Sequence, residues 1–170
     1  YRVEMDDVAE GGMEIMPGVG QDATLSRLDR KEWRMAVTPR FTRLLQYCLS
    51  KGIVYVVIDT ATQVFSGNQN DEQQVVQFIN QLRRLAVAIQ GVVIITKHPS
   101  MTGRTLGTGE SGNVAWNNSV RSRLYLRKDK LGDLVLETMK SNYGRSGEKI
   151  ILHWEHGVFA PWVPGFGAEP

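Results

Sequence analysis

A chain of 170 residues with 42% hydrophobic and 22% charged side chains has the composition of a globular protein and can bury a sizeable core. Its net charge of +2 gives no general argument for a nucleic-acid partner, so any basic surface must be local. No run of about 18 apolar residues predicts a membrane-spanning helix, and the single cysteine, Cys48, excludes an internal disulfide. We therefore expect a cytoplasmic protein with no membrane partner.

Three segments are predicted before residue 53. The apolar-rich residues 13–16 favour a short strand, which Pro17 ends. Residues 20–37 are polar and mixed without a clear period, which predicts a loop. A helix is expected to begin at Pro39, because proline is tolerated in a first turn, and to end at Gly52 as a C-cap glycine would end it.

The middle of the chain predicts a strand, a helix and a second strand. Residues 53–58 and 92–95 are continuous apolar runs rich in β-branched side chains, which is typical of strands buried on both faces of a parallel sheet. Between them, a helix capped by Asn70 or Asp71 runs to about Gln90. This order makes a βαβ unit with a right-handed crossover.

The last third changes character. Residues 99–113 are rich in Gly, Ser and Thr, which predicts a mobile loop. Short apolar segments separated by turns then favour antiparallel strands at a sheet edge. We expect an α/β fold whose mostly parallel sheet is flanked by helices, with an antiparallel extension at the C-terminus. Residues 1–160 are assigned to this core and residues 161–170 to a flexible tail.

Asp59 directly follows the first apolar strand and is the strongest candidate site residue. An acid at the carboxyl end of a parallel strand lies at the crevice where open α/β sheets bind ligands. One carboxylate suffices for Mg²⁺, which keeps several of its waters. The alternative is that Asp59 only caps the turn after the strand, and the two interpretations are about equal when this residue is taken alone.

His98 follows the neighbouring strand and Lys97, so it should lie at the same sheet edge as Asp59. A histidine can donate a hydrogen bond to a phosphate oxygen. An isolated histidine at a strand end is more often solvated, and its placement beside Asp59 is what favours a functional role. Lys140 also follows a strand and, by itself, is weak evidence.

Four segments in this order and spacing resemble the RecA-like P-loop ATPases related to the plasmid replicative helicase RepA. They are Ile58–Thr60, Thr96–His98, Gly112–Leu126 and Lys140–Gly144. The resemblance covers about residues 13–160 and implies a RecA-like core that uses ATP and Mg²⁺. It also implies an ATP-hydrolysing helicase or translocase that acts on single-stranded DNA as a ring-shaped homo-oligomer, with a hexamer as the expected closure.

Within one subunit, the resemblance makes Asp59 the Walker B acid, which holds Mg²⁺ through water, with Thr60 beside the nucleotide. His98 senses the γ-phosphate. The loop after it faces single-stranded DNA in the central channel, with Lys97 and Arg104 as the basic residues that contact DNA.

Between subunits, the resemblance gives Lys140 a role in the neighbour's nucleotide site, and Arg121 occupies the place of an arginine with the same role. A cation acting in trans neutralises charge that develops during phosphoryl transfer. The Lys140–Gly144 segment also resembles the Lys-x-Arg-x-Gly segment of DnaB-type hexameric helicases. Asn142 departs from that pattern where a second basic finger would stand.

The sequence contains no Gly-x-x-x-x-Gly-Lys-[Ser/Thr] motif, and Glu4 is no convincing counterpart of the family's catalytic glutamate. Without such a loop the β- and γ-phosphates have no cradle, so this chain alone is expected not to hydrolyse ATP. Because the chain begins with Tyr1, we expect the loop to precede it in a longer protein.

Two other readings stay open. The first is a non-catalytic module, derived from a RecA-like ATPase, that binds DNA or a partner protein. The second is a dinucleotide site at Gly107–Gly112, which fits Gly-x-Gly-x-x-Gly but lacks the expected strand and helix on either side. The basic stretch from Arg121 to Lys130 suits a solvated strand face as well as a subunit interface or a DNA contact.

Overall fold

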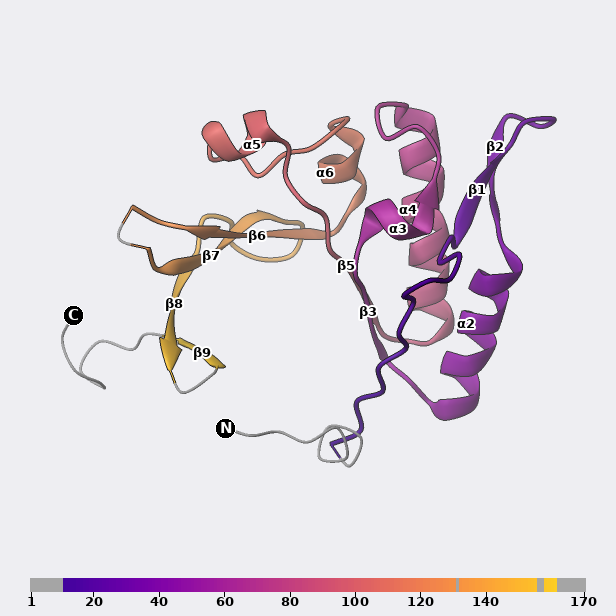
Figure 1. Ribbon diagram of the computed structural model, residues 1–170, viewed down its shortest axis with the longest axis horizontal. Helices are drawn as coiled ribbons and strands as arrows, with labels where there is room; N and C mark the ends of the chain where they lie inside the picture. Colours follow the sequence, from indigo (N-terminus) through magenta and orange to yellow (C-terminus); the bar gives the residue numbers. More distant parts are fainter. Residues whose placement is uncertain (1–10, 131, 156–157, 162–170) are drawn as a thin grey trace. The chain divides into compact units, whose positions relative to one another are not determined.

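The computed structural model describes residues 11–130, 132–155 and 158–161. They belong to two compact units: the core unit is Gly20–Val120, and the C-terminal unit combines Arg121–Pro170 with Tyr1–Val19. The core unit contains β1 (Ser26–Asp29), β2 (Arg34–Val37), α2 (Pro39–Lys51), β3 (Tyr55–Ile58), α3 (Ala61–Val64), β4 (Phe65–Ser66), α4 (Glu72–Ala88), β5 (Val92–Ile95), α5 (Met101–Thr105) and α6 (Ala115–Ser119) (Figure 1). The C-terminal unit contains β6 (Ser122–Lys128), β7 (Leu134–Ser141), β8 (Lys149–Glu155) and β9 (Val158–Pro161).

Strands β3 and β5 pair in parallel, as expected for the βαβ unit, with Ile58 opposite Ile95 at their carboxyl ends. Val56 and Ile58 point into the core, whereas Tyr55 and Val57 are 72% and 63% exposed. Burial on both faces was therefore the wrong expectation: in the described residues, one face of this pair packs against helices and the other is exposed. Figure 1 shows α2 and α4 on the same side of the pair.

Helix α2 begins and ends where its sequence predicts. The Thr38 side chain accepts a hydrogen bond from the Phe41 amide at 3.3 Å, which satisfies one of the free donors of the first turn. Pro39 stands in that turn, and Gly52 at the C-cap has a φ of 65°, where glycine carries no steric penalty.

Helix α4 contributes more buried apolar side chains to the core than any other described element. Asp71, one of the two predicted caps, accepts a hydrogen bond from the Gln74 amide at 3.0 Å. Three side chains of this helix are exposed by 1% or less, namely Val75, Phe78 and Leu85. The helix ends at Ala88, two residues earlier than predicted. The chain then passes so close to β3 that a Cβ at Gly91 would overlap the Val54 carbonyl.

Residues 20–37, predicted as a loop, instead form the antiparallel hairpin β1–β2, and β1 also pairs in parallel with β4. The hairpin is held by α4. The Met35 amide donates to Gln77 Oε1 at 2.6 Å, and Gln81 Nε2 donates to the Met35 carbonyl at 2.8 Å. Polar strands of this kind carry no apolar alternation, so their stability comes from tertiary contacts.

The strand expected at residues 13–16 is also wrong, because these residues form no regular element. The sheets are small: β2–β1–β4, β3–β5 and β6–β7–β8–β9. An α/β fold is confirmed, but a large, mostly parallel sheet is not what the described residues form. The reason is that β1–β2 and all pairs in the C-terminal unit are antiparallel.

The predicted antiparallel strands near the C-terminus are confirmed, but among the described residues they form a sheet of their own and do not extend the β3–β5 pair. Neighbouring strands from β6 to β9 pair in antiparallel order, and the half-buried Glu137 carboxylate lies 3.5 Å from Arg127 and 3.6 Å from Lys149 on the strands at either side. Except for Pro161, which ends β9, the predicted tail lies outside the described residues, as does Glu4. In the ranges that the structure describes, no helix is long and apolar enough to cross a membrane.

Candidate active site

The carboxyl edge of β3–β5 brings together the residues that follow the two strands. The Thr96 hydroxyl donates to Asp59 Oδ1 at 2.5 Å. The backbone fixes this pair: the Thr96 amide donates to the Ile58 carbonyl at 3.0 Å, and the Ala61 amide donates to the Thr96 carbonyl at 2.9 Å. The parallel register therefore sets the position of the carboxylate.

The Asp59 side chain is exposed, and Thr60 after it is half-buried at the N-terminus of α3. An exposed carboxylate with one oxygen held by a hydroxyl fits a single oxygen ligand for Mg²⁺ or for water bound to it. Among the described residues there is no group of three or more His, Cys, Asp or Glu side chains that could hold a metal ion. The role of Asp59 in holding Mg²⁺ stays a prediction.

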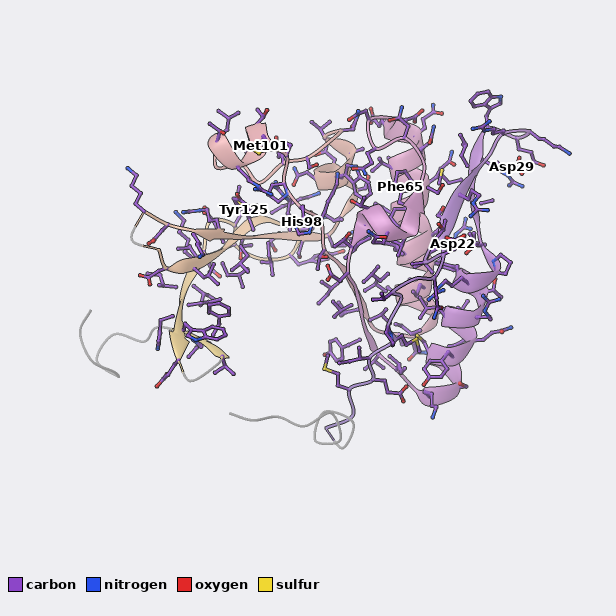
Figure 2. The ribbon with its side chains drawn as sticks, viewed as in Figure 1. Asp22, Asp29, Phe65, His98, Met101 and Tyr125 are labelled. Carbon is purple, nitrogen blue, oxygen red and sulfur yellow. The ribbon has the colours of Figure 1, made fainter. Side chains whose placement is uncertain are left out.

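His98 lies two residues beyond Thr96, and its side chain is exposed at the start of the loop (Figure 2). The structure places it after β5, at the strand edge where the sequence predicted it. Its exposure suits contact with a ligand and suits solvation equally well, so the catalytic role of His98 stays a prediction.

Lys97 has intramolecular partners. Its Nζ donates to the Ser111 carbonyl at 2.6 Å and lies 4.2 Å from the ring centroid of Trp116. The loss of water around this half-buried ammonium lowers its pKa from 10.5 to about 8. A DNA contact for Lys97 stays a prediction, and the geometry gives this residue a second role inside the core unit.

The loop at residues 99–113 has more structure than predicted. It contains the short helix α5, whose cap Ser100 donates through both its amide and its hydroxyl to the Glu110 carbonyl, at 3.0 and 2.9 Å. Gly103 lies against Glu110 so closely that a Cβ there would overlap its carbonyl oxygen. Arg104 on α5 is exposed, which suits the predicted DNA contact without testing it.

The glycines of Gly107–Gly112 lie between the short helices α5 and α6. A dinucleotide site needs such glycines between a strand and a long helix. The structure therefore contradicts the dinucleotide reading.

Lys140 and Arg121 lie in the C-terminal unit. Lys140 on β7 pairs with Arg123 on β6, and the Asn142 amide donates to the Arg121 carbonyl at 3.0 Å, so both residues stand at the same end of the β6–β7 pair. Arg121 Nη1 donates to the Tyr143 hydroxyl at 2.7 Å. The role of these two cations in trans stays a prediction.

Sequence reasoning included Thr96 and Trp116 in the segments of the resemblance but gave neither of them a role in the site. Thr96 could have been found, because it follows β5 in the register at which Asp59 follows β3. Trp116 could not, because its contact with Lys97 spans 19 positions and depends on how the intervening loop folds.

The lowered pKa of Lys97 predicts how stability changes with pH. Between about pH 8 and 10.5, the unfolded chain keeps a proton on Lys97 that the folded chain has lost, so the free energy of unfolding rises with pH. Solvent screening reduces this rise, and so do Ser111 and Trp116, because both favour the charged form of the lysine. We therefore expect a rise on the order of 1 kcal/mol.

Urea unfolding at pH 7, 8, 9 and 10 gives the free energy of unfolding of the wild type and of the Lys97→Met variant. The value for the wild type minus the value for the variant should rise with pH. Burial raises the pKa of the Cys48 thiol, which lowers the free energy of unfolding as pH rises. Both proteins keep Cys48, so this contribution cancels in the difference. A difference that is flat or that falls above pH 8 would contradict the prediction.

A family model described as an AAA domain matches residues 4–104, which is more than half of the chain and includes β3, β5 and Asp59. A search of curated proteins found no match. The matched region ends within α5, so strands β6 to β9 lie beyond it. With a parallel strand pair that carries an acid at its carboxyl edge, this chain belongs to the AAA domain family of ATPases.

Proposed function

We propose that this chain is the C-terminal part of the motor core of an ATP-hydrolysing helicase or translocase of RepA type that acts on single-stranded DNA. The observation that carries the proposal is the exposed Asp59 carboxylate at the carboxyl edge of β3–β5, which is held by Thr96, two residues before His98. In a chain of the AAA domain family, this edge is where phosphates and Mg²⁺ would lie.

In this proposal, ATP with Mg²⁺ is the nucleotide, and the bound ion neutralises charge on the β- and γ-phosphates. Asp59 accepts hydrogen bonds from water on the ion, and the Thr96 hydroxyl keeps the carboxylate oriented toward it. Thr60 borders the nucleotide, and His98 donates a hydrogen bond to the γ-phosphate. These residues position groups in the site, which is the main part of the protein's work in phosphoryl transfer.

The phosphates also need backbone amides and a lysine from a Walker A loop, which these 170 residues do not contain. The proposal requires that the gene encodes this loop before the Tyr1 codon. Sequencing the gene upstream tests this requirement: an in-frame Gly-x-x-x-x-Gly-Lys-[Ser/Thr] followed by a strand supports it. A start codon directly before Tyr1 would exclude hydrolysis by this protein.

The proposed ring places Lys140 and Arg121 in the nucleotide site of the neighbouring subunit. Both stand at one end of β6–β7, and Lys128 at the other end offers a matched control. When Lys140→Ala subunits are mixed equally with subunits that lack the Walker A lysine, random assembly leaves about a quarter of the interfaces with both groups intact. We therefore expect about a quarter of wild-type turnover from two inactive variants.

Steady-state phosphate release from the mixed rings measures this rescue. Lys128→Ala subunits should be active before mixing, because that lysine lies away from the proposed finger. If mixing Lys140→Ala subunits restores no turnover, Lys140 does not act in trans.

A second candidate is a non-catalytic module that binds DNA or a partner protein. It is favoured by one observation, the missing phosphate-binding loop. The gene sequence separates the two candidates, since only the ATPase requires that loop.

A further inference from the structure

The base of the loop after β5 is closed by a side chain. Lys97 precedes the segment 98–110 and Ser111 follows it, and the Lys97 ammonium donates to the Ser111 carbonyl at 2.6 Å. This bond joins the two ends of the segment directly. A hydrogen bond from a charged donor is among the stronger ones that a protein makes.

The same ammonium is tied to the core through Trp116. It lies 4.2 Å from the centroid of the indole ring, within the range of a cation–π interaction. The ring packs edge-on against Phe65 and Phe78, with centroids 5.5 and 6.1 Å apart, and its Nε1 donates to the Gln69 carbonyl at 3.2 Å. Because Phe78 is fully buried, the indole is fixed to the hydrophobic core.

A glycine beside this contact leaves space for the ammonium. Gly112 has a φ of 74°, and a Cβ there would stand 3.2 Å from Lys97 Nζ and 3.0 Å from the Gln69 carbonyl oxygen. Asn113 extends the attachment, since its side-chain nitrogen donates to the Asn70 carbonyl at 3.1 Å. A larger residue at position 112 would press on the ammonium itself and on the Gln69 carbonyl.

Lys97 is also joined to the candidate active site, because Thr96, the residue before it, donates a hydrogen bond to the Asp59 carboxylate. We propose that Lys97 is a positioning residue: with Ser111 and Trp116 it forms a latch that fixes the loop 98–110 relative to the carboxylate. The contacts above support the latch without any assumption about function. An effect of the latch on DNA affinity rests on the proposed function, in which this loop binds single-stranded DNA.

Hydrogen exchange in the full-length protein tests the latch. In Lys97→Met, the loop loses the bond at its base, and we expect its amides, such as that of Gly103, to exchange about tenfold faster. Lys97→Arg keeps a cation that can donate a hydrogen bond to the Ser111 carbonyl, so most of the wild-type protection should remain in this variant. Lys51→Met is the matched control, because its ammonium lies 6.0 Å from the Tyr47 ring on α2. Unchanged loop exchange in Lys97→Met would overturn the latch.

Exchange at the amides of α4 checks the fold in each variant. If they also accelerate, the contact is tested in the unmutated protein labelled with 5-fluorotryptophan, in which the ¹⁹F signal of Trp116 should shift as Lys97 titrates near pH 8. The Trp116→Phe variant assigns that signal. A signal that does not move between about pH 7 and 11, a range that also covers the ordinary lysine pKa, would overturn the latch as well.

Binding of a fluorescent oligo-dT to the same variants separates the latch from the proposed function. Faster loop exchange with affinity at least about threefold weaker, rescued in Lys97→Arg, supports both. Faster exchange with unchanged affinity keeps the latch and removes DNA contact by this loop from the proposed function. Weaker binding without faster exchange overturns the latch and makes Lys97 a direct DNA ligand.

Discussion

Replacing Asp59 by alanine in the full-length protein is expected to lower Mg²⁺-dependent ATP hydrolysis at least about 100-fold, because the site loses the carboxylate that orients the ion. The fold should persist. Asp59 is exposed, and the change removes its hydrogen bond with Thr96, which is worth about 1 kcal/mol. Phosphate release measures turnover, and circular dichroism with urea unfolding measures stability.

Asp29 offers the matched control, because it too is an acid at a strand end. Its carboxylate accepts from the amides of Lys31 and Glu32 at 2.8 and 3.4 Å, so it caps the turn after β1. Asp29→Ala should leave turnover within about twofold and reduce stability by about 1 kcal/mol. If Asp59→Ala instead behaves like Asp29→Ala, then Asp59 is a turn cap and the magnesium role is wrong.

Phe78→Ala is expected to destabilise the core unit by about 3–5 kcal/mol, from lost apolar burial and the cavity left behind. Phe78 is fully buried, and its ring centroid lies 5.0 Å from that of Phe65. Domains of this size are stable by only about 5–15 kcal/mol, so much of the margin would be lost.

Urea unfolding followed by circular dichroism measures this loss. Val87→Ala, on the same helix but 72% exposed, is the control and should change stability by less than about 0.5 kcal/mol. A loss below about 1 kcal/mol for Phe78→Ala would contradict the packing described for α4.

The helices and the βαβ order could be predicted from the sequence because their signals are local. Thr38 and Asp71 cap their helices through bonds that span three residues. The hairpin β1–β2 could not be predicted, because Gln77 and Gln81 hold it from more than 40 positions away. For the same reason, an apolar run such as residues 55–58 does not reveal which of its faces another element will cover.

In the candidate site, too, local patterns predicted some residues, whereas long-range contacts place others. Asp59 and His98 follow apolar strands, so the pattern of the strands predicted their shared edge. The partners of Lys97 depend on the path of a folded loop, so only the basic side chain could be identified from the sequence. The placement of Lys140 and Arg121 at the same end of the β6–β7 pair follows from the β6–β7 register, which includes an irregularity between Arg123 and Leu124 that no local pattern predicts.

Steady-state phosphate release by the full-length wild-type protein tests the central claim most directly, with Mg²⁺ or excess EDTA and with or without oligo-dT. We predict turnover that requires Mg²⁺ and rises at least about threefold with single-stranded DNA. No release of phosphate from ATP under any of these conditions would contradict the assignment of this chain to an active ATPase core.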